Sequence, residues 1–160
     1  MSKQTPPPEE FEPEFIAGLK QMFEERIPFN QILGLRIVSL RPERVLGRIE
    51  MKPHLVGNFS HNRLHGGVIS AALDAMAGLA CMAAIGARHM DLPPESRLQR
   101  FVKLGTIDLR IDYLRPGLGE HFDLSAEVLR LGSRVASTRM ELRGADGKLL
   151  STGSGAYIVS

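Results

Sequence analysis

The sequence predicts an α+β domain in which an antiparallel sheet of about five or six strands supports one long helix. Three observations predict this architecture. The segment 66–87 is long, apolar and rich in small side chains. Segments that alternate apolar and polar residues lie before and after it, as expected for strands. Gly and Pro separate those segments, as expected for the turns of a sheet.

Length and composition predict a single domain. The chain has 160 residues, of which 43% are hydrophobic, enough to bury one core. Residues 1–11 are rich in Pro and Glu and predict a flexible N-terminal segment, which leaves residues 12–160 as the domain. No apolar stretch follows Lys3, so we expect no secretory signal. Cys81 is the one cysteine, which excludes an internal disulfide and favours a cytoplasmic protein with a buried thiol.

Two kinds of element are predicted before the long apolar segment. Residues 12–26 place apolar side chains at helical spacing, and Pro28 ends this predicted helix. The segments 33–40 and 44–51 alternate apolar and polar residues about a short turn at 41–43, which predicts a β-hairpin.

Four further strands are predicted after the apolar segment, over residues 106–114, 121–131, 134–143 and 149–159. Alternation in the first of them places one set of residues on one face: Ile107, Leu109, Ile111 and Tyr113. The opposite, polar face then carries Thr106, Asp108, Arg110 and Asp112. One helix cannot close both edges of such a sheet, so we expect edge strands of two copies to pair in a homodimer.

Asp74 is the one charged residue in the apolar segment. An ionised carboxylate in apolar surroundings is costly unless it is paired or reaches water, so Asp74 indicates a role other than packing. A buried acid hydrogen-bonded to a loop is the structural alternative. The acid and the many Ala and Gly residues disfavour a membrane span, and a helix apolar on every face is more simply one surrounded by protein.

The predicted helix begins at His65, Gly66 and Gly67. Both glycines are expected to offer unpaired backbone N–H groups at the positive end of the helix dipole, where an oxyanion binds well. The missing Cβ also lets a carbonyl group approach the backbone closely. A flexible helix entry without any ligand is the alternative that a Gly-Gly pair alone allows.

Gly66 and Asp74 are too far apart to serve one carbonyl group within one chain. Eight residues separate them, which is roughly 12 Å along a helix and about 80° around it. If both groups act in one reaction, they must come from different chains, with two antiparallel helices passing each other across a two-fold axis. The spacing therefore also predicts a dimer.

Two motifs together match a known family. The matching residues are Asn58, Leu64-His65-Gly66-Gly67, Asp74, the segment 105–110 and the Tyr-Leu-Arg-Pro-Gly segment 113–117. With them the chain resembles the hotdog-fold acyl-CoA thioesterases of the PaaI type, from about Phe23 to the C-terminus. The resemblance implies a hotdog fold, in which a curved antiparallel sheet wraps a long central helix. It also implies a dimer formed through the sheet edge, and two dimers could assemble into a tetramer.

The resemblance further implies roles for individual residues. Asp74 would act on the thioester as general base for water or as nucleophile, while the Gly66 N–H of the other subunit polarises the carbonyl. His65 would orient the thioester or the turn. An amide side chain ahead of His65 would hold the carbonyl or the water; Asn58 is the candidate. Because Asn58 stands one residue farther from His65 than in many relatives, Asn62 is the fallback.

An acyl-CoA substrate requires a basic rim for its phosphates and an apolar channel for its acyl tail. Candidate cations are Arg88, Arg97, Arg100, Lys103, Arg115 and Arg134, of which we single out Arg115 and Arg134. Gly67 and Val68 are further substrate-binding candidates, and the tail is expected along Val68, Ile69, Ala72 and Met76. The connector 88–103 is long and contains Pro93-Pro94, so we expect a lid over the acyl chain or a subunit contact.

Other functional classes are disfavoured. The net charge is only +2 and no dense basic run is present, so we expect no nucleic-acid partner. His61 and His65 have the spacing of two helical metal ligands, but no Glu follows His61, and we expect neither metal nor cofactor. The Gly-x-Ser-x-Gly motif of serine hydrolases is absent from the sequence.

The expected function is therefore hydrolysis of medium- to long-chain fatty acyl-CoA thioesters to free fatty acid and CoA. A non-catalytic hotdog module that binds or senses acyl-CoA is the alternative. A hydratase on the same fold is a third option, but the sequence lacks a second acid-base pair of Asp and His.

Overall fold

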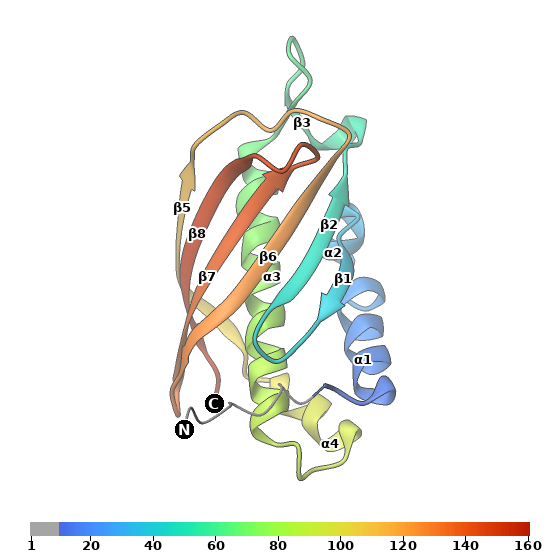
Figure 1. Ribbon diagram of the computed structural model, residues 1–160, viewed down its shortest axis with the longest axis vertical. Coiled ribbons are helices and arrows are strands. Elements are labelled where there is room, and N and C mark those ends of the chain that lie inside the picture. The colour runs from blue at the N-terminus through green and yellow to red at the C-terminus, as the bar shows by residue number, and fades with distance from the viewer. Residues whose placement is uncertain (1–9) are drawn as a thin grey trace, which may run out of the picture.

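A six-stranded antiparallel sheet lies across one long helix in the computed structural model, which describes residues 10–160 (Figure 1). The strand order is β1-β2-β6-β7-β8-β5, so β1 and β5 are the two edges. The strands are β1 (Arg36–Leu40), β2 (Val45–Glu50), β5 (Gly105–Tyr113), β6 (His121–Leu131), β7 (Val135–Gly144) and β8 (Leu149–Ile158). This is the predicted α+β hotdog architecture, with all six strands within a few residues of their expected positions.

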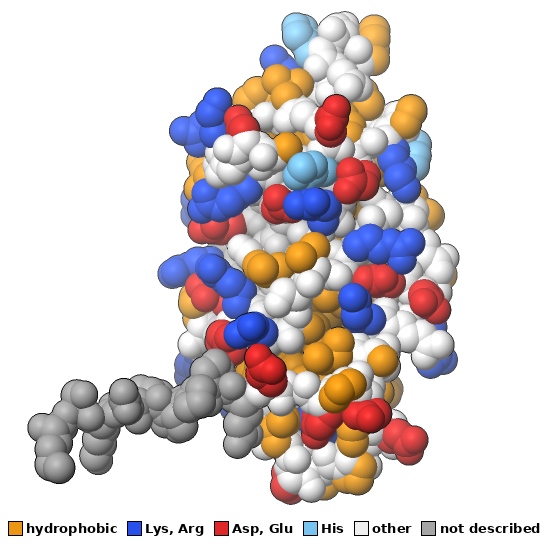
Figure 2. Space-filling model, turned by 45° about the vertical axis from the view of Figure 1, so that its right-hand side comes forward, with side chains coloured by type: hydrophobic (Ala, Val, Ile, Leu, Met, Phe, Trp, Pro, Cys, Tyr) orange, Lys and Arg blue, Asp and Glu red, His pale blue; other side chains and the backbone are white. Residues whose placement is uncertain are grey.

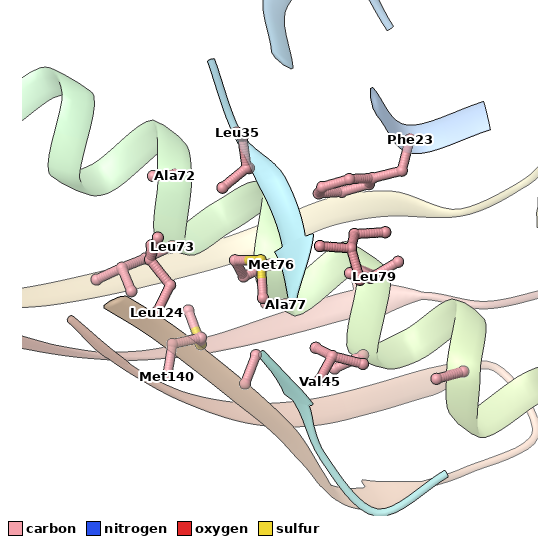
Figure 3. Close-up of a cluster of buried hydrophobic side chains, with 14 of the residues drawn as sticks. Phe23, Leu35, Val45, Ala72, Leu73, Met76, Ala77, Leu79, Leu124 and Met140 are labelled. Carbon is pink, nitrogen blue, oxygen red and sulfur yellow. The ribbon is translucent and has the colours of Figure 1, made fainter. Parts of the chain in front are cut away.

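The central helix α3 spans Gly66–Arg88 and packs one face on the sheet. Its small side chains allow close approach, and its larger ones interlock with the strands; Leu73 lies with Leu124 and Met140 in the core (Figure 3). The helix is long and apolar enough to cross a bilayer, but just over half of its most apolar 18-residue stretch is buried within the protein. It is therefore a core helix of this domain.

The N-terminal helical region differs from the prediction of one helix ended by Pro28. Helix α1 (Pro13–Lys20) continues into a π-helical turn η1 (Gln21–Glu25), and a second helix α2 (Pro28–Leu33) then follows. Pro28 thus begins a helix, because the first helical position needs no intrahelical N–H donor. These helices lie beside β1 and β2 (Figure 1).

The predicted domain boundary needs a small correction. Residues 1–9 of the expected flexible segment lie outside the described residues. Phe11, which was assigned to that segment, is only 5% exposed, and its ring lies 4.8 Å from the ring of Phe15. Burial of an aromatic ring is a large part of core energetics, so the packed domain includes Phe11.

The connector between α3 and β5 carries a short helix α4 (Pro94–Leu98) and a 3-10 turn η3 (Gln99–Phe101). Helix α4 packs against α1 near the C-terminal end of α3 (Figure 1). Arg97 is fully buried there, with its guanidinium group 4.4 Å from the centre of the Phe15 ring and hydrogen-bonded to Glu12. Arg97 is thus a structural residue, and it is not available to bind phosphate.

The chain ahead of α3 forms a small hairpin. A 3-10 turn η2 (Pro53–Leu55) leads into β3 (Val56–Asn58) and β4 (Arg63–Leu64). The N–H of His65 donates to the carbonyl of Leu55 at 2.8 Å, and the N–H of Leu64 donates to the carbonyl of Gly117 at 2.9 Å. These bonds fix the position at which α3 begins.

A β-bulge in β5 changes which face Thr106 occupies. Thr106 pairs with Tyr157 of β8 and Asp108 pairs with Ala156, which leaves Ile107 as an extra residue. Such a residue breaks the two-residue alternation of side chains. The predicted polar face is therefore wrong for Thr106, which turns toward α3, and the predicted apolar face is wrong for Ile107, which is 56% exposed.

Candidate active site

The entry of α3 holds one backbone donor that is already used and one that is free. The side chain of His65 caps the helix, because its Nδ1 accepts a 2.8 Å hydrogen bond from the N–H of Gly67. The expectation that Gly67 offers an unpaired N–H is therefore wrong. The N–H of Gly66 donates to no acceptor among residues 10–160. Gly66 is thus the one glycine of the pair whose N–H is open to a ligand at the positive end of the helix.

Tyr113 at the end of β5 packs directly over Gly66. Its hydroxyl donates to the carbonyl of Gly66 at 3.0 Å, and a Cβ placed on Gly66 would lie 3.4 Å from the Tyr113 ring. A Cβ at Gly66 would thus be in ordinary van der Waals contact with the Tyr113 ring. An open cavity of about 350 Å³ lies beside Gly66 and Tyr113. Ile69 and Arg115 belong to its wall.

Asp74 lies on a partly open face of α3 and is held by two hydroxyl groups. The phenol of Tyr157 donates to Oδ1 of Asp74 at 2.7 Å, and the hydroxyl of Thr106 donates to the same oxygen at 2.8 Å. Within the described part of the chain, Oδ2 of Asp74 accepts no hydrogen bond. The alternative of an acid bonded to a loop is thereby excluded, since both donors are on strands.

Tyr157 remains a donor over the whole working pH range. Burial, and then its hydrogen bond to Asp74, raise the pKa of the Tyr157 phenol well above its ordinary value of 10. A phenol that stays neutral cannot act as a base, so Tyr157 serves as a hydrogen-bond donor to the carboxylate. Sequence reasoning missed both Tyr157 and Thr106, because only strand pairing and the bulge bring them to the helix.

Asn58 and Asn62 both lie in the hairpin before His65, and no hydrogen bond among residues 10–160 joins either side chain to Gly66. Oδ1 of Asn58 accepts the N–H of Ser60 at 3.1 Å, so this side chain stabilises the turn of its own hairpin. Asn62 adopts a left-handed backbone conformation, with φ at 49°, in the same turn. A catalytic role for either side chain stays a prediction.

The other predicted substrate-binding residues lie at both ends of α3. Arg115 lies at the end that contains Gly66 and donates to the carbonyl of Leu149 at 2.9 Å. Val68 is half-buried in the first turn of the helix. Arg134 is exposed in the turn between β6 and β7, at the opposite end of the helix (Figure 1).

The expected acyl channel along α3 is partly wrong. Ile69, Ala72 and Met76 are at most 3% exposed and pack against the chain's own sheet. The sulfur of Met76 lies so close to Gly47 that a Cβ there would be 2.7 Å away. These side chains fill the core and leave no room for a tail. The open face of the helix carries Ser70, Ala71, Ala75 and Gly78 instead.

Gly66 and Asp74 lie on one uninterrupted helix, α3. At 1.5 Å per residue they are therefore roughly 12 Å apart along its axis. One chain thus carries an oxyanion donor and a carboxylate that cannot reach the same carbonyl group.

Two further observations concern other kinds of site. No group of three or more His, Cys, Asp or Glu side chains that could hold a metal ion occurs within residues 10–160. On the face of the molecule in Figure 2, Lys and Arg side chains are interspersed with Asp and Glu side chains. Nucleic-acid binding faces are typically basic over a continuous stripe, and this face is not.

The chain matches the model of the thioesterase superfamily over residues 61–151. It is 39% identical over 139 residues to the medium/long-chain acyl-CoA thioesterase YigI of Escherichia coli K12, which covers 87% of this chain and 90% of that protein. The Salmonella typhimurium protein of the same name is 40% identical over 141 residues, with the same shares covered.

Solved structures give the same result. A Shewanella oneidensis protein described as related to the thioesterase superfamily is 39% identical, with a TM-score of 0.85, over 94% of this chain and 100% of that one. The E. coli PaaI structure shares the fold at 17% identity and a TM-score of 0.73 over 92% of this chain and 94% of that one. The matched residues include the His65 helix entry and Asp74. The chain therefore belongs to the thioesterase superfamily and has its hotdog fold.

Proposed function

We propose that this protein hydrolyses medium- to long-chain fatty acyl-CoA thioesters to free fatty acid and CoA in the cytoplasm. The name of the E. coli and Salmonella relatives supports this substrate class. The observation that carries the proposal is the Asp74 carboxylate, which has one oxygen held by Tyr157 and Thr106 and the other free on an open helix face.

In the proposed reaction, Oδ2 of Asp74 accepts a proton from a water molecule whose oxygen attacks the thioester carbonyl carbon. The carbonyl π electrons move to oxygen, and a helix N-terminal N–H stabilises the oxyanion that forms. The tetrahedral intermediate then collapses, the C–S bond breaks and the thiolate of CoA leaves. The proton held by Asp74 passes to the thiolate or to solvent, which restores the carboxylate. A thiol has a pKa near 8.5, so this leaving group needs little help from an acid. A carboxylate base and one well-placed oxyanion donor can therefore suffice.

The oxyanion donor in this proposal is Gly66 of the partner subunit. Gly66 and Asp74 of one chain are too far apart to meet at one carbonyl group, and both lie on the accessible side of the protein. In a homodimer with antiparallel α3 helices, Asp74 of each chain would face Gly66 of the other. Small residues on the open face, such as Ser70 and Ala71, allow close helix contact. The free edge strand β5 would extend the sheet, and two dimers could form a tetramer.

Substrate contacts are assigned on the same basis. Gly67 and Val68 would line the thioester end beside the partner's Asp74. Arg115, which lies in the wall of the cavity beside Gly66, and Arg134 would contact CoA. His65 would act through the helix, because its ring caps the turn that carries Gly66. Asn58 would have to leave its hairpin bond in order to reach the carbonyl.

A thiol-release screen over acyl-CoA substrates of increasing chain length tests the activity. We expect the highest kcat/KM with medium and long chains, and a loss of about 10²–10⁴-fold in kcat for Asp74→Asn. Asp146→Asn is a matched control, because Asp146 is an exposed acid in the turn between β7 and β8. Wild-type rates in Asp74→Asn would contradict the mechanism. Acyl-CoA binding without thiol release by the wild type would favour the non-catalytic module.

A further inference from the structure

A second cavity lies at the other end of α3 from Gly66, where the connector and the turn between β6 and β7 meet. Its volume is about 390 Å³, within the range of small-molecule sites. Its wall is formed by Ile85, Arg88, His89, Gln99, Arg100, Val102, Lys103, Leu131, Gly132, Ser133, Val159 and Ser160. Three cationic side chains and a histidine are present, and no Asp or Glu belongs to this wall.

The cations of this cavity differ in how they are held. Arg88 donates to the carbonyls of Leu131 and Gly132, so its guanidinium group is fixed at the end of β6. Arg100 and Lys103 form no ion pair with any residue in the range 10–160. The net charge of the whole chain is only +2, so three cationic side chains around one cavity whose wall has no Asp or Glu side chain are a local concentration of positive charge. Such a concentration attracts phosphate groups, and arginine binds them with several N–H donors.

The cavity also lies on the same side of α3 as Asp74. Ile85 and Arg88 are eleven and fourteen residues beyond Asp74, which places them about 20° and 40° from it around the helix axis. Along the axis they are ~16 Å and ~21 Å away. Gly78 lies between, and a Cβ there would meet no atom within 4 Å, so the surface above it is open.

The pantetheine arm of CoA covers most of this separation. Between its sulfur and the first phosphorus it has about as many bonds as four residues of backbone, which extend to ~14 Å. With a thioester at Asp74, the extended arm would bring the pyrophosphate close to Ile85, and the nucleotide that follows it close to Arg88.

We infer that this cavity binds the phosphate-bearing nucleotide of the CoA group, with Arg88, Arg100 and Lys103 as its phosphate ligands. The inference rests on the proposed function. Ile85, Val102 and Val159 provide apolar surface against which an adenine ring packs. The connector 88–103 is then a substrate-binding segment, in place of the acyl-chain lid or subunit contact that its length suggested.

The test separates nucleotide binding from hydrolysis. The double variant Arg100→Gln/Lys103→Gln removes two cations whose side chains are exposed, and Arg26→Gln/Lys52→Gln removes an exposed Arg and an exposed Lys elsewhere. Binding of adenosine 3′,5′-bisphosphate is measured by calorimetric titration, which needs no thioesterase activity. We expect the cavity variant to weaken this binding by about tenfold or more and the control variant by less than twofold.

Kinetics supply the second measurement. For each substrate, the KM of the cavity variant is divided by the KM of the wild type. This ratio should be about tenfold larger for an acyl-CoA than for the matching S-acyl-pantetheine, which has no nucleotide. Equal binding of the bisphosphate by wild type and cavity variant would overturn the inference, whatever the thioesterase activity. Equal affinity for inorganic pyrophosphate and the bisphosphate would also overturn it, because the cavity would then not recognise a nucleotide. Bisphosphate binding without thiol release would overturn the proposed function instead.

Discussion

Tyr157 and Asp74 are joined by a 2.7 Å hydrogen bond from the phenol to Oδ1, although 83 residues separate them in the chain. Thr106 donates to the same oxygen. Two donors on one oxygen restrict the orientation of the carboxylate, and Oδ2 accepts no hydrogen bond from residues 10–160. Preorganisation of this kind lowers the reorganisation that a catalytic group needs during the reaction.

Loss of the Tyr157 hydroxyl is expected to impair turnover more than substrate binding. Tyr157→Phe should lower kcat about tenfold and change KM by less than threefold, because the carboxylate then rotates away from its reactive orientation. Steady-state kinetics with one acyl-CoA measure both constants. Thr106→Val should act in the same direction. Thr138→Val is the control, since the Thr138 hydroxyl donates to the carbonyl of Gly155 and not to Asp74. If all three variants lost activity in proportion to their stability, an orienting role would be ruled out.

Two inactive variants are expected to complement each other if the site lies between subunits. Gly66→Pro removes the free N–H, and the site tolerates proline because Gly66 is the first helical residue and His65 before it is extended. Alone it should lose about 10²–10³-fold in kcat.

A refolded equimolar mixture of Gly66→Pro and Asp74→Asn contains dimers with one intact site. Random pairing predicts that about a quarter of all sites are intact, and about a quarter of the wild-type rate. No recovered activity in verified mixed dimers would show that Gly66 and Asp74 do not act together at one site between subunits.

His65 is expected to act as a helix cap. His65→Ala should lower the free energy of unfolding by about 1 kcal/mol, because the N–H of Gly67 loses its acceptor. His65→Asn should restore most of that stability, since Asn is a preferred capping residue. Urea denaturation and thiol-release rates measured on both variants decide the question. Full loss of activity in a stably folded His65→Asn variant would show that the imidazole itself contacts the substrate.

The Cys81 thiol is expected to be inert in the folded protein. Burial raises the pKa of Cys81 to about 12, and only the thiolate reacts readily with disulfide reagents. At pH 8 the native protein should therefore react with a chromogenic disulfide far more slowly than the same protein in guanidinium chloride. Rapid reaction of one thiol per native chain would show that α3 opens near Cys81.

The pair of Arg97 and Glu12 is expected to make stability fall in acid. The hydrogen bond from Arg97 holds the pKa of Glu12 below its ordinary value of 4.5. A carboxyl whose pKa is lower in the folded state adds stability above the unfolded value, and this contribution disappears as the pH falls below it.

Glu12→Gln leaves the buried Arg97 guanidinium group without its carboxylate. The variant should lose about 1–3 kcal/mol at pH 7 and show a weaker dependence on pH between 5 and 3. Thermal unfolding across this range measures both effects, with Glu14→Gln as an exposed control in the first turn of α1. An unchanged pH profile in Glu12→Gln would mean that other acids dominate acid unfolding.

Local sequence patterns were sufficient to predict most of the secondary structure and the unusual position of Asp74. Alternation and turn residues were enough to predict the six strands, and the apolar run after His65 predicted the core helix. Asp74 stood out because a carboxylate is costly in apolar surroundings, and helix geometry alone separates it from Gly66. Such features depend on neighbouring residues and on fixed helix dimensions, so they can be derived before the fold is known.

Only the tertiary structure decided which groups surround Asp74. Tyr157 arrives through the pairing of β8 with β5, and Thr106 arrives because a one-residue bulge reverses its face. The hydrogen bond from Gly67 to His65 depends on the backbone angles at the helix entry. Arg97 is buried while Arg100 stays exposed, because α4 packs on α1. These outcomes follow from contacts between distant segments and from single-residue shifts of register, which the periodicity of one segment does not encode.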